Sequence, residues 1–336
     1  MGRLERVHHS KLNLATRLLV LVAVLSPCVV SAQVTTRAYP VKPITLIVPF
    51  APGNTDVIAR LFLQKISENT GWSFTYDYKP GGAATIGTEA AVRATPDGHT
   101  LLMNSPSLLA VALSKRKLSY DWRRDLRPVY QMTKTPTILL VNATLPVTSL
   151  KEYVAYAKAN PGKINYAMTG SGSIGHLLAV WMHGMMGVEV TYIPYKGFGP
   201  IAVAMASGEV VAASPAYKSF HGFITAGKLR ALAISSANGR ITQLPGVRSI
   251  AEEGYPEYDS FSWSGIFTPA ATPLPVVERL NTEFAKAIDA KDLSAKLEEL
   301  GEGKGGGSYE AFARFLASSS DRLVKIVKDS GIEIEE

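Results

Sequence analysis

The sequence has little cysteine, few charged residues and no long hydrophobic run. Cys28 is the single cysteine in 336 residues, which excludes a disulfide framework and any zinc or iron–sulfur site built from several cysteines. The 28 glycines and 20 prolines are near the globular average and exclude collagen-like and Pro/Gly-rich disordered classes. Charged residues make up 19% and hydrophobic residues 46%, so the composition is typical of a globular protein long enough for two domains.

The net charge of +7 is concentrated at the N-terminus. Residues 1–32 contribute +3, which leaves +4 for the remaining 304 residues. No run of Lys and Arg with interleaved aromatic residues occurs, so we expect no nucleic-acid partner.

The N-terminal segment has the pattern of an export signal. A basic start is followed by the apolar run 18–30, which Pro27 interrupts and which is shorter than the roughly 20 residues of a membrane span. Val30, Ser31 and Ala32 then supply the small residues of a cleavage site. We predict a signal peptide over 1–32, removed on export to the periplasm. A lipoprotein anchored through Cys28 is the alternative, and Pro27 directly before the cysteine disfavours it. No later segment reaches 18 apolar residues, so we expect the exported chain to have no membrane span.

The rest of the chain alternates between strand and helix patterns. Predicted strands lie at 44–48, 74–78, 99–104, 137–142, 164–168, 190–193 and 229–235, and predicted helices at 56–69, 85–94, 149–160, 174–186, 201–207, 275–290 and 309–329. This alternation predicts an α/β fold with largely parallel sheets, in which ligands bind at the carboxyl ends of the strands. The glycine-rich run 301–308 is predicted to be at most a flexible linker.

Four loops of small residues follow predicted strands, at 52–55, 80–85, 169–173 and 195–197. The first three run directly into helices, whose free N–H groups attract anions. A carboxylate is therefore a suitable ligand, and ordinary turn and cap chemistry is the alternative interpretation.

Nucleotide motifs are incomplete in this chain. Gly170, Gly172 and Gly175 match the spacing GxGxxG, but Glu189 falls before the next predicted strand rather than at its end, where a ribose-binding acid belongs. Gly303-Lys304 is followed by glycine, so no phosphate loop is present. We expect no cofactor.

The histidines and serines give only weak signals for chemistry. His176 and His183 lie two helical turns apart without the HExxH spacing, so we expect no metal site. Ser171 or Ser173 beside His176 would suit a hydrolase, but the GxSxG elbow is missing and no acidic partner is identifiable.

Longer motifs connect the sequence to a family. The segments YPVKPITLIVPFAPGNTDVIAR, KPGGAATIGTEAAVRATPDGHTLLM, YAKANPGKINYAMTGSGSIGHL, VTYIPYKGFGP, AGKLRALAISSANGR, LPGVRSIAEEGYP and FTPAATPLPVVERLN resemble, in order, the substrate-binding proteins of tripartite tricarboxylate transporters, the Bug family. The resemblance covers about residues 39–331. It implies a two-domain periplasmic binding protein of the type II, Venus-flytrap kind, with crossing strands between its domains. It also implies a receptor without catalysis that delivers small carboxylates to an inner-membrane permease.

The resemblance gives expected boundaries and site residues. Domain one is predicted at 39–138 plus 240–336 and domain two at 139–239, with crossing strands near 137–142 and 229–236. The implied ligand-binding residues come from the strand-to-helix loops, and Lys196 has surface pairing as an equal alternative. They are Pro52, Gly53, Asn54, Thr55, Ser105, Thr169, Ser171, Ser173, His176, Tyr195, Lys196, Ala213 and Ser214.

Three departures from the family pattern bear on the ligand. The first loop, PFAPGNTD, is one residue shorter than usual, and the stretch 80–84 has alanines where glycines are usual. The stretch 210–215 lacks two acids, at Val211 and Pro215. Neutral lining beside Tyr195, Phe198, Tyr217 and Phe220 leads to the hypothesis of an apolar or aromatic carboxylate.

We therefore expect a monomeric periplasmic receptor for a small organic carboxylate, working with the permease subunits of a tripartite carrier. The alternatives are a sensor that presents its ligand to a histidine kinase and an exported serine hydrolase using Ser171 or Ser173.

Overall fold

The computed structural model describes residues 39–52 and 54–334. The predicted signal peptide, Gly53, and the side chains of Asn54 and Thr55 lie outside this description. None of the helices in the described ranges is long and apolar enough to cross a bilayer.

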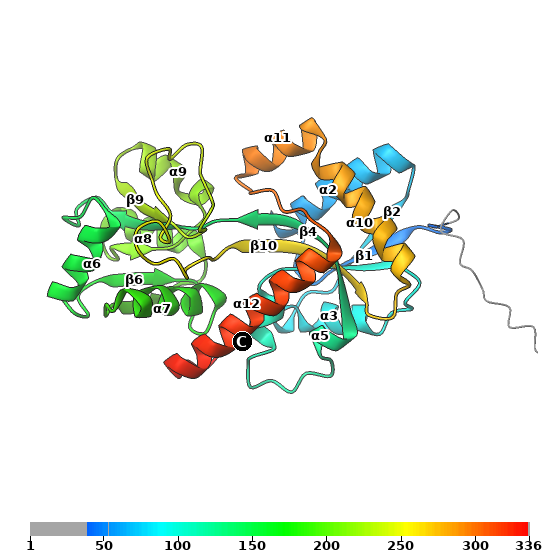
Figure 1. Ribbon diagram of the computed structural model, residues 1–336, viewed down its shortest axis with the longest axis horizontal. Helices are drawn as coiled ribbons and strands as arrows, with labels where there is room; N and C mark the ends of the chain where they lie inside the picture. Colours follow the sequence, from blue (N-terminus) through cyan, green and yellow to red (C-terminus); the bar gives the residue numbers. More distant parts are fainter. Residues whose placement is uncertain (1–38, 53, 335–336) are drawn as a thin grey trace, which may run out of the picture. The chain divides into compact units, whose positions relative to one another are not determined.

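The first sheet has five strands in the order β2-β1-β3-β10-β4 (Figure 1). They are β1 Ile44–Val48, β2 Phe74–Tyr78, β3 Thr100–Asn104, β4 Leu126–Thr135 and β10 Ser262–Pro269. β1 is parallel to β2 and β3, whereas β10 is antiparallel to β3 and β4. Its helices are α2 Asn54–Thr70, the 3₁₀ turn η2 Gly82–Ala84, α3 Thr85–Val92, α4 Ser107–Val111, α5 Trp122–Asp125, α10 Leu274–Ile288, α11 Lys291–Leu300 and α12 Tyr309–Ser330.

The second sheet has five strands in the order β7-β6-β8-β5-β9. They are β5 Ile138–Asn142, β6 Asn165–Met168, β7 Thr191–Pro194, β8 Ala212–Ala213 and β9 Leu229–Ile234, and the helices are α6 Leu150–Ala159, α7 Ile174–Met186, α8 Phe198–Ser207 and α9 Tyr217–Thr225. β6 is parallel to β7 and β8, whereas β5 is antiparallel to β8 and β9. The α/β prediction is confirmed, and both sheets are mixed rather than purely parallel.

Both faces of the first sheet are buried, which explains the continuous apolar run of β1. Successive strand side chains point to opposite faces. Leu46 and Val48 therefore pack with Phe62 of α2, whereas Ile47 packs in the cluster that contains Phe312 of α12. A strand buried on both faces has no room for alternating polar residues.

Two long strands of the first sheet connect it to the second. β4 passes through Pro136 and Thr137 directly into β5, near the predicted crossing. The chain returns to the first sheet after Ser260, later than the predicted crossing near 229–236. The Ser260 N–H still donates to the Ser235 carbonyl (3.1 Å), at the end of the second sheet and just before β10 begins.

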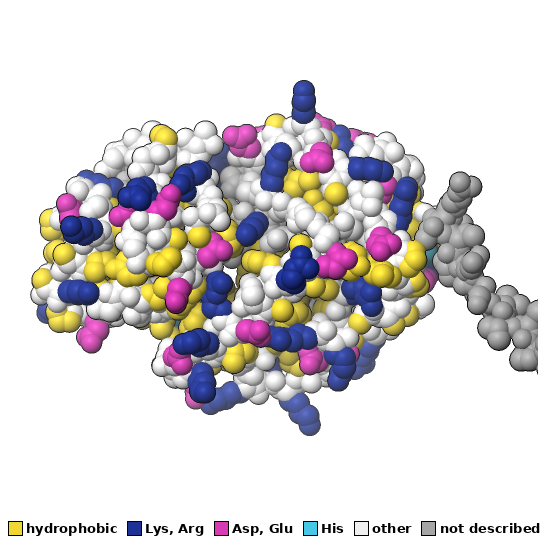
Figure 2. Space-filling model, viewed as in Figure 1, with side chains coloured by type: hydrophobic (Ala, Val, Ile, Leu, Met, Phe, Trp, Pro, Cys, Tyr) yellow, Lys and Arg dark blue, Asp and Glu magenta, His cyan; other side chains and the backbone are white. Residues whose placement is uncertain are grey.

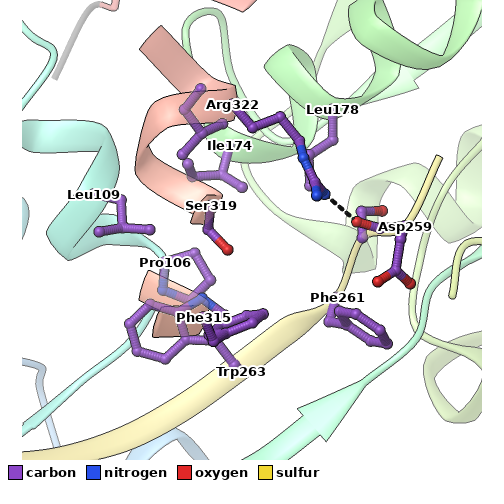
Figure 3. A pocket seen from close by; sticks show the side chains of 12 residues that line it. Pro106, Leu109, Ile174, Leu178, Asp259, Phe261, Trp263, Phe315, Ser319 and Arg322 are labelled. Carbon is purple, nitrogen blue, oxygen red and sulfur yellow. Dashed lines mark hydrogen bonds between the residues drawn. The ribbon is translucent and has the colours of Figure 1, made fainter. Parts of the chain in front are cut away.

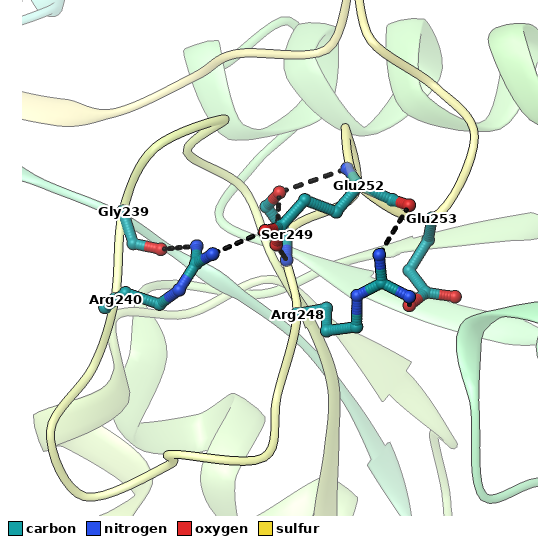
Figure 4. A network of polar contacts seen from close by, with 6 residues as sticks. All are labelled: Gly239, Arg240, Arg248, Ser249, Glu252 and Glu253. Atoms are coloured by element: carbon teal, nitrogen blue, oxygen red, sulfur yellow. Dashed lines mark hydrogen bonds and ion pairs between the residues drawn. The ribbon is translucent and has the colours of Figure 1, made fainter.

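The segment 241–258 packs with the second sheet, although the predicted division assigned it to domain one. Ile250 and Tyr258 are buried in the core of the second sheet. The Ser249 hydroxyl and N–H donate to the Glu252 carboxylate, which also pairs with Arg240 (Figure 4). These polar contacts fold the segment back beside β9.

The glycine-rich run 301–308 is not a flexible linker, so that prediction is wrong. The Lys134 N–H donates to the Gly303 carbonyl (2.9 Å), and the Gly305 and Gly306 N–H groups donate to carbonyls of β4 (3.1 and 2.8 Å). The run therefore lies along the free edge of β4 as an ordered, hydrogen-bonded strip.

Candidate functional site

The predicted site residues of the first sheet lie at the edge where its parallel strands end. β1 and β3 are neighbours and parallel, so the loops after Val48 and Asn104 meet at one carboxyl edge. Pro52 is exposed on the first of these loops, and Ser105 is half-buried on the second.

The predicted residues of the second sheet share its carboxyl edge in the same way. Met168 pairs with Pro194 and Ala167 pairs with Ala213, so β6, β7 and β8 end side by side. The loops 169–173, 195–197 and 214–216 therefore form one continuous rim, which brings together the predicted residues from Thr169 to Ser214.

A small cavity marks where the two carboxyl edges approach each other (Figure 3). Pro106 follows Ser105 on the first edge, and Ile174 follows Ser173 on the second, and both line this cavity. Arg322 of α12 closes another side by donating to the Asp259 carbonyl. The loops of the two sheets are therefore neighbours across the chain crossing.

The Gly-Ser loop is held by its own polar groups. The Ser173 hydroxyl caps α7 by accepting from the His176 N–H (3.2 Å), and the Gly172 N–H donates to Nδ1 of His176 (3.1 Å). Ser171 remains exposed on the loop. The Ser173 hydroxyl and the Nδ1 atom of His176, which a hydrolase would use as nucleophile and base, are thus both bonded to backbone amides.

Tyr195 and Lys196 differ in how their polar ends are used. The Tyr195 hydroxyl donates to Glu209 (2.8 Å), which precedes β8 rather than following it. Burial, with this carboxylate, raises the pKa of Tyr195. Lys196 is exposed and forms no ion pair with any residue of the described chain, so the alternative of surface pairing is not seen.

The loop after β8 provides neutral groups. Ala213 is fully buried in the strand and offers only its backbone, and Ser214 is half-buried beside it. The next residue, Pro215, accepts a hydrogen bond from the Ile138 N–H (2.9 Å). This loop therefore touches the crossing from β4 to β5.

The acid nearest the first loop is already paired. Asp56, in the first turn of α2, is fully buried and accepts from Nε of Arg60 (2.6 Å) and from the Tyr78 hydroxyl (2.5 Å). The hydrogen bond to Asp56 raises the pKa of Arg60. The negative charge at this edge is therefore balanced internally.

Two polar residues at the first edge were not predicted. Asn104 is buried at the end of β3, where its Oδ1 accepts from the Ser105 N–H (2.9 Å) and its Nδ2 donates to Thr88 (3.0 Å). Asn104 could have been found from the sequence, because it is the polar residue that ends the apolar strand TLLMN. Arg116 lies beside Gly82, since a Cβ built there would be 3.3 Å from its Nη1. Nothing in the local sequence brings these two residues together.

The two histidines of α7 have structural partners. His183 is buried between the hydroxyls of Tyr153 and Tyr192, each 2.9 Å from a ring nitrogen, and burial lowers its pKa to about 3. Within the described ranges, no group of three or more His, Cys, Asp or Glu side chains has the arrangement of a metal site.

Charge on the visible surface is mixed. On the face drawn in Figure 2, Lys and Arg side chains are scattered among Asp and Glu side chains rather than gathered in one patch. A local anion site on such a surface depends on individual side chains and backbone groups.

Comparison with known proteins connects this arrangement to solute receptors. The family described as "Tripartite tricarboxylate transporter family receptor" matches residues 58–332. Protein BugT of Bordetella pertussis is 32% identical over 95% of this chain and 99% of its own. The solved structure "R. palustris Rpa4515 with adipate" is 33% identical, with a TM-score of 0.72 over 88% of this chain and 99% of that one. MatC from Rhodopseudomonas palustris "with bound malate" is 28% identical, with a TM-score of 0.67 over 86% and 100%.

Proposed function

Because the chain belongs to the tripartite tricarboxylate transporter family of receptors, we propose that it captures a small organic carboxylate between its two sheets and delivers it to a membrane permease. The family consists of periplasmic solute-binding receptors, not enzymes. We further propose that residues 1–32 direct export and that the receptor acts as a monomer.

The observation that carries this proposal is the rim of the second sheet, which faces the loops of the first. It combines helix-start backbone, the Ser171 hydroxyl and the exposed Lys196, which forms no ion pair in the described chain. A cation next to free N–H groups attracts an anion. The adipate and malate bound to two related structures support a carboxylate as that anion.

We also propose that the ligand carries an apolar or aromatic body. Phe198 begins α8 directly after the Tyr-Lys-Gly loop and keeps 41% of its surface exposed. Its ring meets Phe220 edge-to-face at 6.3 Å, which fixes its orientation. The loop 214–216 supplies no acid that would bind an amine or repel a carboxylate.

The proposed motion is a hinge between two lobes, one around each sheet. The crossings at Pro136 and Ser260 support a division in which 138–258 forms the second lobe. Closure around a ligand would bring the two rims together.

Thermal unfolding against a panel of mono-, di-, tri- and aromatic carboxylates tests the proposal. The protein is first unfolded and refolded to remove bound ligand. A ligand at 100 times its Kd stabilises the fold by about 2.7 kcal/mol, a shift of several degrees. No shift across the panel with refolded protein would contradict the proposal.

Two variants locate the site. Replacing Lys196→Gln removes a charge-assisted contact and should weaken binding about tenfold or more. Lys163→Gln is the matched control, because Lys163 is exposed before β6, at the opposite end of the strand. Phe198→Ala should weaken apolar and aromatic ligands more than malate. Equal binding by Lys196→Gln and Lys163→Gln would remove Lys196 from the site.

A further inference from the structure

The loop between β6 and α7 is closed by a histidine side chain. The Gly172 N–H donates to Nδ1 of His176 (3.1 Å), four residues ahead, while the His176 N–H donates to the Ser173 hydroxyl (3.2 Å). In one bond the His176 side chain accepts from the loop backbone, and in the other the His176 backbone donates to a loop side chain. Gly172 is buried and has φ +70, so the loop backbone at this point is tightly folded. The exposed Ser171 directly precedes Gly172, the first of the bonded residues.

The ring of His176 rests on a buried polar cluster. It meets Tyr192 of β7 at 5.0 Å between centroids, close to edge-on. The Tyr192 hydroxyl is 2.9 Å from Nδ1 of His183, whose Nε2 is 2.9 Å from the Tyr153 hydroxyl. Tyr166 of β6 packs edge-on against His183 at 4.9 Å. The position of the His176 ring is therefore set by residues of α6, β6, β7 and α7 together.

We propose that His176 is a positioning residue: its neutral ring holds the Gly-Ser loop in the shape that binds the ligand, and protonation of the ring releases the loop. This role differs from direct ligand contact, because the Nδ1 lone pair is occupied by the backbone of the loop. The ligand-binding part of the proposal rests on the proposed receptor function, whereas the loop-holding part does not.

The tautomer explains the pH dependence. Nδ1 accepts a hydrogen bond only when the ring is neutral with its hydrogen on Nε2, and in the cation both nitrogens are donors. A protonated ring would then point an N–H at the Gly172 N–H. The titratable groups facing the ring are Tyr192 and, behind it, His183, and both are neutral near pH 7, since burial raises the pKa of Tyr192 and lowers that of His183. Burial also lowers the pKa of His176, so release occurs below its ordinary value near 6.5.

Hydrogen exchange of the loop tests the loop-holding part without any ligand. In the purified protein, protection of the amides in 169–173, corrected for intrinsic exchange rates, should fall as the pH drops from 8 toward 4.5. His176→Asn places an amide oxygen near the position of Nδ1 and does not titrate, so its loop should stay protected across this range. His176→Phe keeps a ring against Tyr192 but has no acceptor, so its loop should exchange fast at every pH. His221→Asn, on exposed α9, is the matched control and should follow the unmodified protein.

Circular dichroism at each pH identifies any variant that unfolds, and the comparison is made only where all four proteins are folded. Protection in His176→Phe at pH 8 equal to that of the unmodified protein at pH 8 would overturn the proposal. So would a pH-independent loop in the unmodified protein.

Calorimetric titration with adipate and with malate tests the ligand part. Both proteins should bind more weakly in acid, because the carboxyl groups of adipate and malate take up protons there. The unmodified protein should lose about tenfold more affinity than His176→Asn between pH 8 and the acid end, as expected for the loss of one buried hydrogen bond. A loop that opens in acid with the same loss of affinity in both proteins would overturn the ligand part alone. Failure of every carboxylate to bind at pH 8 would count against the proposed function, while the exchange result would still decide the loop-holding role.

Discussion

The segments 80–84 and 301–308 are both rich in small residues, but only the second has glycine wherever its backbone requires it. In 301–308, positive φ angles occur at Gly301, Gly306 and Gly307. In 80–84 they occur at two glycines and also at Ala83 (φ 52) and Ala84 (φ 74), the non-glycine residues with positive φ in the described chain. A left-handed backbone costs an L-residue roughly 1–2 kcal/mol.

The difference is related to what each segment touches. Gly303 and Gly305 lie directly on the backbone of β4, where a Cβ would be 2.3 Å from the Lys134 oxygen and 2.1 Å from the Gln131 oxygen. No side chain fits there, so glycine is required by contact. Ala83 and Ala84 precede α3 at the carboxyl edge of the first sheet. There the alanine side chains fit, and the unfavourable free energy comes from the left-handed backbone. Strained backbone at an edge that faces a proposed ligand is a common property of binding sites.

The largest effect should come from Gly305→Ala. Its new methyl group would be 2.1 Å from the Gln131 oxygen and 2.8 Å from the Met132 carbonyl carbon, both backbone atoms of β4. The strip 303–306 must then leave β4 and lose its hydrogen bonds, so we expect a loss of about 3 kcal/mol or more in the free energy of unfolding. Chemical denaturation with urea measures this difference. A loss below 1 kcal/mol would mean that the run is mobile after all.

Sequence alone predicted several features of the second sheet and its helices, because their signals are local. The Ser149 cap of α6 is present as expected from its capping box, since the Ser149 hydroxyl accepts from the Glu152 N–H (3.2 Å). The loop after β6 also follows a strand and precedes a helix as predicted. Such features depend on residues three or four positions apart, which a sequence pattern contains.

The crossing strands were not predictable in the same way. β4 contains Pro128 and the buried polar residues Gln131 and Thr133. A proline and polar residues are more typical of a loop than of a buried strand, so the sequence pattern did not indicate β4. Thr133 is satisfied by Ser264 of β10 (2.8 Å), a partner 131 residues away. β8 has only two residues, too few for any periodicity. The candidate ligand-binding residues likewise come from loops far apart in the sequence, so their relative positions are set by the fold and not by any local pattern.

A moderate effect of opposite sign should come from Ala83→Gly, at a half-buried position. Relief of the left-handed strain is worth roughly 1–2 kcal/mol, and the extra freedom of glycine in the unfolded chain costs about 0.4–1 kcal/mol. The strain term is larger, so we expect the variant to be more stable by about 0.5–1 kcal/mol in the same urea titration. Ala84→Gly should gain less, because Ala84 is buried and the variant also loses the packing of its methyl group. Destabilisation by both variants would indicate that the alanine methyl groups make packing contacts worth more than the strain.

The smallest effect should come from Gly246→Ala, which completes the comparison. A Cβ at Gly246 meets no atom within 4 Å, and φ there is outside the left-handed range. Only the unfolded-state term remains, so the variant should be unchanged or more stable by at most about 1 kcal/mol. Both variants add the same methyl group, so urea titration of Gly246→Ala beside Gly305→Ala separates the effect of backbone contact from the effect of replacing a glycine. Equal losses at both positions would show that backbone contact is not what requires glycine in the strip along β4.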